Sequence, residues 1–380
     1  MANNLFFSRD TRVLVEADST VWEIPVLDGF SFSQATNTSE ISLSEMESTG
    51  GASRRGRRMF NDSYAPAEWN FSTYMRPFLS VVDAATGWDG TSAQMHAVEE
   101  IMWASLISAG QFNAKADADD NAEWTAASGI AQSASALAFD FSDSNKSALK
   151  EINIYFVMGQ GAFNSGSHKV YKIESCAVNS AAIEFDIEGI ATINWSGFGK
   201  LITDTGSLPT VTIAEAIDST KNFIRNRLTT LTVSATTAES IVGTYNLTLT
   251  GGNIEFNNNI TYLTPETLGV INQPIAHVTG TRTISGAFTC YLGNHSAGSA
   301  DLFEDLIESK NTITNDFDLT FGIGGSNAPK VAIQLPTCHL EIPTHSVAEI
   351  MSLETNFHAL PSTVDGADDA TITYTGTTYT

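Results

Sequence analysis

The sequence is poor in basic residues and in cysteine. Of 380 residues, 19 are Lys or Arg and 43 are Asp or Glu, which gives a net charge of −24. Nucleic-acid-binding proteins usually carry a basic domain or face, so this balance argues against a general affinity for a polyanion. The three cysteines, Cys176, Cys290 and Cys338, are odd in number and far apart. They exclude a disulfide framework, and we expect buried thiols in a protein of a reducing cytoplasm.

Long hydrophobic runs are also missing. No segment approaches 18 uninterrupted apolar residues, and the start, MANNLFFSRDTRVLV, has no basic stretch followed by an apolar one. We therefore expect neither export nor a membrane span. The chain is 42% hydrophobic and 16% charged, and it is long enough for two ordinary domains, each with a packed core.

Motifs for catalysis, nucleotides and metals are absent as well. No Walker A, HExxH, GxSxG or EF-hand pattern occurs, and GQGAFN at 159–164 follows a predicted strand without opening a helix. Cys338, His339, His345 and His358 match no zinc-ligand spacing, so core or surface roles are the simpler interpretation. We expect no enzyme, no catalytic residue, no cofactor and no metal.

Alternating polar and apolar residues dominate what is present. With β-branched and aromatic enrichment, this period of two predicts strands in IPVLDGFSFSQ, AEWNFSTYM, EINIYFVMG, AAIEFDIEGIATINW, TRTISGAFTCYL and KVAIQLPTCHLEI, among others. The aromatic residues Trp69, Phe71, Phe185 and Trp195 fall inside these strands. Helices are predicted over 95–107, with Val98, Ile101, Met102 and Leu106 on one apolar face, and over 300–310, capped by Ser299. The expected class is mainly β, with sheets that form a sandwich or barrel.

The predicted elements occur twice in the same order. Each half gives a glycine-containing strand, a polar stretch, two further strands, a helix, a strand and a final strand pair. Cys176 and Trp195 are 19 residues apart, as are Cys338 and Phe357. We interpret this as a tandem duplication, each copy with one flanking helix.

Domain boundaries follow from the repeat. They are 1–200 for the first β domain, 201–240 for a connector, 241–362 for the second β domain and 363–380 for a loosely held tail. The first domain contains an Arg-rich loop at 48–66 and an acidic insertion at 111–136, of which 115–123 is predicted to be solvated. The connector contains a predicted short helix over 214–222.

An arginine cluster, SRRGRRMF at 53–60, stands out on this acidic chain. It contains Arg54, Arg55, Arg57 and Arg58, followed by the apolar Met59 and Phe60. A local basic patch needs a local partner, either nucleic acid or acidic protein, which includes another copy of the chain. The alternative is a flexible, solvated loop with no partner.

Acidic residues recur at every second position in two stretches. The stripes are Glu184, Asp186 and Glu188 in one stretch, and Glu45 and Glu47 in the other. Spacing by two places such side chains on one side of a strand, and Phe185 and Ile187 are then predicted to face the core. A solvated charged sheet face is the simplest interpretation. Many copies lining a cavity would give it a uniformly negative wall.

This ordering resembles the tail tube proteins of tailed bacteriophages. The resemblance rests on LDGFSFSQATNTSEISLSEME, STGGASRRGRRMFNDSYAP, AEWNFSTYM and KVYKIESC through INWSGF, and on the second copy from NLTLTGGNIEF to LETNFHAL. It implies a virion tail protein, assembled in the host cytoplasm, whose β-sandwich contributes strands to a ring-shaped barrel. Stacked rings form the channel for DNA ejection, and a long hairpin loop reaches the next ring.

The resemblance also implies partners and sites. The partners are other copies, tail tip and terminator proteins, the tape measure protein and transient viral DNA, with no sequence-specific binding and no membrane. The contact loop between rings carries Arg54, Arg55, Arg57, Arg58, Met59 and Phe60, and the candidate lumen acids are Glu45, Glu47, Glu184, Asp186 and Glu188. Two domains per chain imply a trimeric, pseudo-six-fold ring, with a hexamer as the alternative. A β-rich receptor-binding module and an enzyme acting on nucleic acid are the competing functions.

Overall fold

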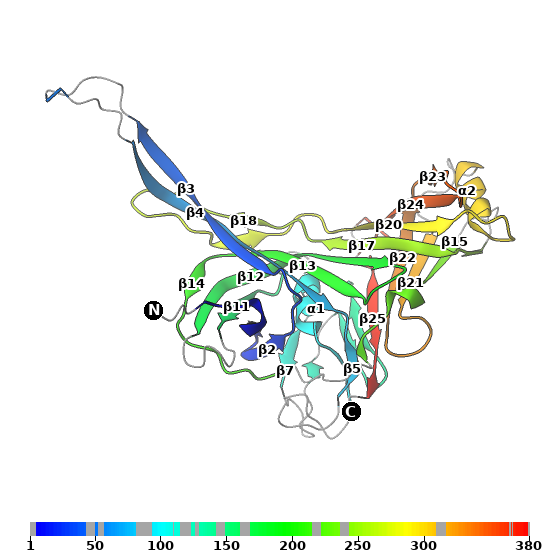
Figure 1. The fold of residues 1–380 in the computed structure, drawn as a ribbon, viewed down its shortest axis with the longest axis horizontal. Coiled ribbons are helices and arrows are strands. Elements are labelled where there is room, and N and C mark those ends of the chain that lie inside the picture. The colour runs from blue at the N-terminus through cyan, green and yellow to red at the C-terminus, as the bar shows by residue number, and fades with distance from the viewer. Residues whose placement is uncertain are drawn as a thin grey trace.

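The protein folds almost entirely from β-strands, most of them antiparallel (Figure 1). The computed structural model describes residues 5–42, 50–51, 57–80, 93–108, 110–114, 123–125, 129–141, 149–159, 168–214, 222–235, 243–308, 317–364, 366 and 368–378. Two short α-helices occur within these residues, and neither is long and apolar enough to cross a membrane. The predicted fold class, mainly β, is confirmed.

The elements follow one another along the chain as two series. The first series is η1 (Ser8–Asp10), β1 (Thr11–Ala17), β2 (Thr20–Ile24), β3 (Ser31–Ser42), β4 (Arg57–Tyr74), β5 (Pro77–Leu79), β6 (Met95–Ala97), α1 (Glu100–Ile107), β7 (Gln111–Asn113), β8 (Glu123–Thr125), β9 (Ile130–Gln132), β10 (Leu137–Asp140), β11 (Ile152–Met158), β12 (Lys169–Asp186), β13 (Thr192–Gly199) and β14 (Ile202–Asp204).

The second series is η3 (Asn226–Leu228), β15 (Thr230–Ala235), β16 (Thr244–Asn246), β17 (Leu249–Asn257), β18 (Thr261–Leu263), β19 (Ala276–Val278), β20 (Thr283–Tyr291), α2 (Ser299–Glu308), β21 (Phe317–Ile323), β22 (Lys330–Leu340), β23 (Thr344–Ser346), β24 (Ser352–Ala359), β25 (Thr371–Thr375) and β26 (Thr377–Thr378).

One long antiparallel sheet spans both series in the order β3, β4, β13, β12, β17, β20, β24, β22. Its alternating sequence places apolar side chains on one face, where they are buried. The four aromatic residues Trp69, Phe71, Phe185 and Trp195 lie in strands as predicted, and all four are buried. The opposite face is polar.

A second layer of strands packs against the apolar face. It comprises β2, β1, β11, the first part of β12 and β14, and separately β16, β15, β21, the first part of β22, β25, β10 and β9. β12 and β22 therefore belong to both layers. Trp103 of α1 lies edge-on to Trp195 and Phe256, at ring-centroid distances of 4.9 and 5.5 Å. The two halves share one hydrophobic core.

The two series pair their strands in the same pattern. The long sheet takes β3, β4, β13, β12 from the first half and β17, β20, β24, β22 from the second. An identical bulge interrupts the next layer: Ile152 pairs with Cys176 and Ile154 with Ile173, while Phe317 pairs with Cys338 and Leu319 with Leu335. Each cysteine thiol donates to the carbonyl three residues earlier, that of Ile173 or Leu335. All three cysteines are buried and free, as expected.

The first helix departs from its prediction at both its start and its faces. Residues 95–97 form β6, because their backbone pairs with β5, and α1 begins only at Glu100. All eight residues of α1 are buried, including Glu100 and Ser105, so it has no solvent face. The second helix is amphipathic as predicted, with Leu302 and Leu306 turned inward. The Ser299 hydroxyl bonds to the backbone of Gly293 and Tyr291 instead of capping the helix.

The C-terminal segment is not loosely held. β25 lies between β22 of the second half and β10 of the first, pairing with both (Figure 1, red). Tyr374 is fully buried, and β26 adds a parallel pairing to β5. The prediction of a loose tail was wrong because the strand TITYT finds its partners far away in the sequence.

Three other predicted non-regular segments contain strands. Residues 57–66 of the Arg-rich loop belong to β4, which pairs with β3 as far as Arg57. The acidic insertion contains β7, β8 and β9, and its Phe112 and Trp124 pack edge to face at 5.1 Å. The connector contains β14 and β15. The predicted connector helix falls largely on 215–221, and residues 115–122 and 160–167 also lie outside the described residues.

Candidate functional site

The polar face of the long sheet carries acidic and amide side chains. Six strand segments form its central part: 68–74, 180–186, 192–198, 251–257, 283–289 and 352–358. Their exposed members on this face are Glu68, Asn70, Glu184, Asp186, Asn194, Asn253, Glu255, Thr283, Glu354, Asn356 and His358. No Lys or Arg occurs in these segments. We call these eleven residues the polar face. It is uniformly free of fixed positive charge.

Short polar contacts tie neighbouring strands of this face together. The Ser72 hydroxyl donates to Asn194 Oδ1 at 2.6 Å, and Ser180 and Ser196 are 2.7 Å apart. Between β24 and the end of β22, the Asn356 side-chain amide donates to Glu341 Oε2 at 2.8 Å. The pKa of the Glu341 carboxyl lies below its ordinary value. The hydrogen bond from Asn356 is the main cause, and the hydrogen bond with His358 is the second. Glu341 therefore stays anionic under mildly acidic conditions.

Two of the predicted lumen acids lie on the polar face. Glu184 and Asp186 are exposed on β12, and Glu188 is exposed just after that strand ends. With Glu354 they border one shallow depression. Phe185 is buried as predicted, but Ile187 is 45% exposed, because β12 ends at Asp186 and the alternation ends with it.

Two predicted lumen acids remain, and other exposed acids of the polar face were not predicted. Glu45 and Glu47 lie outside the described residues. Glu68, Glu255 and Glu354 were not singled out from the sequence. The signal was available, because each lies between two buried residues of a strand, in AEWNF, NIEFN and SLETNF.

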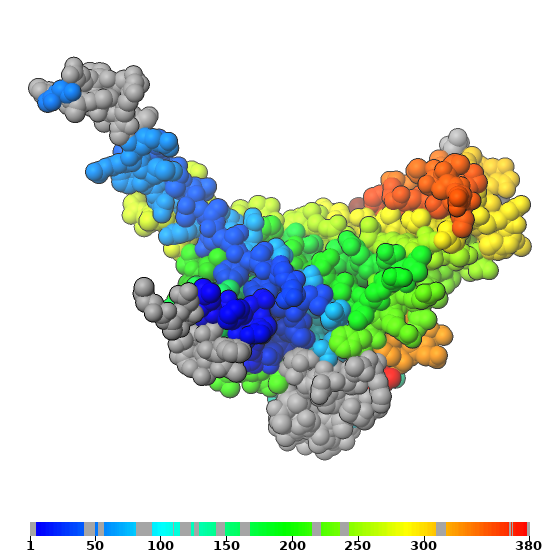
Figure 2. Space-filling model, in the orientation of Figure 1, coloured from blue at the N-terminus to red at the C-terminus, as the bar shows by residue number. Residues whose placement is uncertain are grey.

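A projecting arm extends from one end of the long sheet (Figure 1). It consists of the outer parts of β3 and β4, from Thr36 to Ser42 and from Arg57 to Tyr64, together with the β18–β19 hairpin, from Thr261 to Val278. The backbone of Asn272 joins the two hairpins: its N–H donates to the Asp62 carbonyl oxygen at 3.1 Å, and its carbonyl oxygen accepts from the Tyr64 N–H at 2.9 Å. The space-filling view shows the arm standing clear of the body (Figure 2).

The arm exposes apolar side chains and part of the arginine cluster. Met59 is 58% exposed and Phe60 is 53% exposed. Other exposed apolar residues of the arm are Ile41, Leu263, Leu268, Val270, Ile271, Ile275 and Val278. Arg57 is engaged within the arm, with Nε 2.5 Å and Nη2 2.7 Å from the two carboxylate oxygens of Glu40. Arg58 is exposed, and Arg54 and Arg55 lie outside the described residues.

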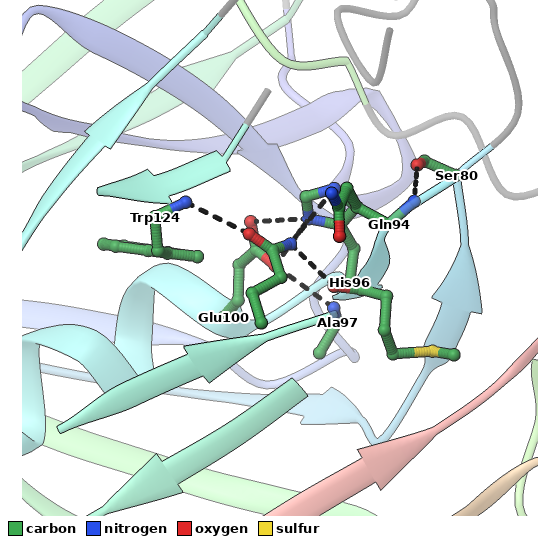
Figure 3. A network of polar contacts seen from close by, with 8 residues as sticks. Ser80, Gln94, His96, Ala97, Glu100 and Trp124 are labelled. Atoms are coloured by element: carbon green, nitrogen blue, oxygen red, sulfur yellow. Dashed lines mark hydrogen bonds and ion pairs between the residues drawn. The ribbon is translucent and has the colours of Figure 1, made fainter. Parts of the chain in front are cut away.

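A buried polar network lies away from both surfaces. His96 Nδ1 is 3.0 Å from Glu100 Oε2, Gln132 donates to the Met95 carbonyl, and Trp124 N donates to Gln132 (Figure 3). Gln132 belongs to the acidic insertion and Glu100 begins α1, so the network links the insertion to the start of this helix. Both partners of the His96–Glu100 pair are buried.

A second buried carboxyl fastens the C-terminal strand. The Tyr374 hydroxyl donates to Glu99 Oε1 at 2.8 Å and accepts from Trp103 Nε1 at 2.6 Å. Burial raises the pKa of Glu99 to about 7, and the Tyr374 hydrogen bond only partly offsets this. Within the described ranges no cluster of three or more His, Cys, Asp or Glu is arranged to hold a metal ion. The histidines near Cys338, which are His339, His345 and His358, have exposed side chains.

A two-layer β-fold with an acidic sheet face and an exposed apolar arm suits a structural protein. The chain belongs to the phage tail tube protein family, whose sequence model matches residues 83–377. It is similar to the tail tube protein pb6 of Escherichia phage T5, with 28% identity over 377 residues, covering 95% of this chain and 74% of the relative. The resemblance identified from the sequence is confirmed, and the chain is a structural component of the virion tail.

Proposed function

We propose that copies of this chain join edge to edge into rings and that stacked rings form the channel through which viral DNA passes. The observation that carries the proposal is the seam between β12 and β17. These strands pair over seven residues, from Ser180 opposite Asn257 to Asp186 opposite Gly251. Both halves keep their polar residues on the same face across it. One chain thus already contains a junction between two neighbouring units of a curved wall.

The outer strands of the long sheet support repetition of this seam between chains. Within the described residues β3 pairs only with β4, and the end of β22 together with β23 pairs only with β24. In the matching strand order, β3 corresponds to β17 and β22 to β12. The β22–β23 edge of one copy would therefore receive β3 of the next. Closure removes edges that would otherwise promote uncontrolled pairing.

The matching strand orders and the shared bulge support a tandem duplication. The units then run from β1 to β14 and from β15 to β25, so the second unit begins near Thr230 and ends near Thr375. These bounds assign parts of the expected connector and tail to the second unit. Three chains supply six units, which favours a trimeric, pseudo-six-fold ring over a hexamer of chains.

The charge of the polar face suits a DNA channel. Contact with phosphates through Lys and Arg generates non-specific affinity for DNA, and the polar face has neither residue. With this face lining the lumen, its carboxylates repel the DNA backbone and limit adhesion during passage. Tail tip, terminator and tape measure proteins are the further partners expected at the ends and inside of such a tube.

Electron microscopy of the purified chain at high concentration tests the proposal. Hollow tubes or rings are expected, and native mass spectrometry of rings should give the mass of three chains. Monodisperse single chains at all concentrations would contradict the tube role, and six chains per ring would contradict the fused-unit stoichiometry.

A further inference from the structure

A short segment before β15, residues 223–226, fastens the second half of the chain to the first. It lies beside the turn between β12 and β13. The Ala191 N–H donates to the Ile224 carbonyl oxygen at 2.8 Å. Next to this bond, Ile190 and Arg225 form an antiparallel bridge. Ile224 and Ala191 are both buried, so the segment and the turn cover each other.

The strand registers identify the counterpart of this segment in the first half. Val15 of β1 lies opposite Ile154, and Val233 of β15 lies opposite Leu319. Ile154 and Leu319 are the residues that follow the shared bulge, so Val15 and Val233 occupy the same position in their halves. Counting back from them superposes η1 on η3. The counterpart of 223–226 is therefore 5–8, which we call the N-terminal segment.

The N-terminal segment is exposed where its counterpart is covered. Phe6 corresponds to Ile224, and Phe7 corresponds to Arg225. Phe6 is 45% exposed, whereas Ile224 is buried against the first half. Phe7 is also exposed. Two adjacent exposed aromatic side chains at such a position indicate a surface that a further molecule covers.

The turn between β23 and β24 is the counterpart of the β12–β13 turn. β13 and β24 each have eight residues. Just before β13, the Ala191 carbonyl oxygen accepts from the Met75 N–H at 3.0 Å. Just before β24, the Met351 carbonyl oxygen accepts from the Leu292 N–H at 2.9 Å. Met351 therefore occupies the position of Ala191. The second turn has five residues against seven, so the correspondence is counted from the strand that follows it.

The two turns differ in exposure as the two segments do. Ile350 precedes Met351 and occupies the position of Ile190. Ile350 is 63% exposed, and Met351 is exposed as well, whereas Ala191 is buried. Among the described residues, no backbone carbonyl oxygen accepts from the Met351 N–H. The β23–β24 turn thus keeps its pairing position open.

An aromatic contact repeats this difference. Phe223 packs edge to face on Tyr74 of β4, with ring centroids 5.2 Å apart. Tyr74 pairs with the first residue of β13, as Tyr291 pairs with the first residue of β24. Tyr291 is exposed, and so is Leu5, the counterpart of Phe223. Every apolar member of the internal contact therefore has an exposed counterpart on one side of the molecule or the other.

We propose that the N-terminal segment of one copy pairs with the β23–β24 turn of a neighbouring copy in the same ring. This rests on the proposed ring, and it extends the seam at which β22 of one copy receives β3 of the next. The dark blue N-terminal elements and β23 lie at opposite sides of the molecule, as such a contact between neighbours requires (Figure 1).

The internal contact supplies the register of the proposed one. The Phe6 carbonyl oxygen accepts from the Met351 N–H. Phe7 lies opposite Ile350, and the residue before Phe6 packs on Tyr291. Backbone bonds of an added strand provide affinity, and the side chains beside them provide specificity for this partner.

Disulfide trapping tests the register at one residue pair. The variant Phe7→Cys, Ile350→Cys is assembled and oxidised, and the products are separated by non-reducing electrophoresis. Chains linked to one another are expected, because the partners of an antiparallel bridge lie close enough for a disulfide. The native cysteines are all buried and do not compete.

Two matched pairs control this measurement. Ile190→Cys, Arg225→Cys places the same pair at the internal contact and should close within single chains. Phe7→Cys, Val364→Cys places the second thiol on an exposed residue outside the turn and should leave chains unlinked. Unlinked Phe7→Cys, Ile350→Cys chains in well-formed rings overturn the proposal. Equal linkage through Val364 also overturns it.

A single substitution provides a second, independent measurement. Phe6→Asp changes an exposed side chain, so the circular dichroism of the single chain should stay the same. Its ring yield should fall about tenfold or more, as expected for the loss of an apolar anchor. Val364→Asp makes the same kind of change at another exposed apolar residue and should leave the ring yield unchanged.

The outcomes separate this proposal from the tube function. Rings of Phe6→Asp at the wild-type yield overturn the pairing of the N-terminal segment and leave the tube role standing. Absence of rings and tubes from the wild-type chain itself rejects the proposed function.

Discussion

Two adjacent glycines at the seam between the halves should respond in opposite ways to the same substitution. Gly252 lies opposite Phe185 in the β12–β17 pairing, and Gly251 lies opposite Asp186. A Cβ at Gly252 would lie 2.5 Å from the Ala287 carbonyl oxygen and 2.8 Å from the Phe185 ring. A Cβ at Gly251 would have only the Phe185 carbonyl within reach, at 3.4 Å.

The expected magnitudes follow from these clearances. Gly252→Ala forces backbone or the buried ring to move, and overpacking of this kind costs about 1–3 kcal/mol of the free energy of unfolding. Gly251→Ala meets no such obstacle. Its main effect is to restrict the unfolded chain, which raises the free energy of unfolding by about 0.4–1 kcal/mol. The two variants are matched in chemistry and differ only in which face of the seam receives the methyl group.

Urea denaturation at neutral pH, followed by tryptophan fluorescence and circular dichroism, measures both effects. We expect the midpoint to fall for Gly252→Ala and to stay level or rise for Gly251→Ala. Equal midpoints for Gly252→Ala and the wild type would refute the argument that Phe185 packs tightly over a glycine at the seam. A fall for both would show that backbone conformation, not side-chain space, sets the tolerance.

Three further predictions concern buried and exposed polar groups. Since burial raises the pKa of Glu99 from 4.5 to about 7, the unfolded chain releases its proton first as pH rises, and stability should fall between these values. Glu99→Gln should flatten that part of the pH profile of unfolding, and an unchanged slope would contradict the assignment. Tyr374→Phe leaves the buried Glu99 and Trp103 without their shared partner, so a loss of about 1–3 kcal/mol is expected in denaturant titrations; wild-type stability would rule out a clamp by this hydroxyl. Tubes with Glu255→Lys and Glu354→Lys should retain duplex DNA in sedimentation assays at low salt and release it at high salt, whereas no retention would argue that the polar face does not line the lumen.

Local patterns were sufficient for the class of fold and for much of the polar face. Period-two alternation correctly placed Phe185 inside and Glu184 and Asp186 outside, because strand geometry alone determines which side a residue faces. The same reasoning failed at Ile187, where the strand had already ended. The end of a strand is set by its pairing partner, and the sequence of one strand does not contain that information.

The arm shows a similar limit. Residues 48–66 were predicted to form a loop, yet residues 57–66 belong to β4, and β3 and β4 pair as far as Ser42 and Arg57. Backbone hydrogen bonds between the two strands stabilise an extended ribbon without requiring an apolar side. The contact of Asn272 with Asp62 and Tyr64, which joins two hairpins some 200 residues apart, carries no signal in either segment.

The sequence by itself determined the β-rich class, the free buried cysteines, the repeated order of elements and the alternation that makes one sheet face acidic. Each of these depends on composition or on contacts between near neighbours. Only the tertiary structure decided that β12 meets β17, that β25 inserts between the halves, and that α1 is buried on every side. Those outcomes depend on which strand edges meet across at least 37 residues of chain, the separation of Gln334 and Thr371. Competing edges offer nearly the same backbone hydrogen bonds, so packing of the shared core selects among them.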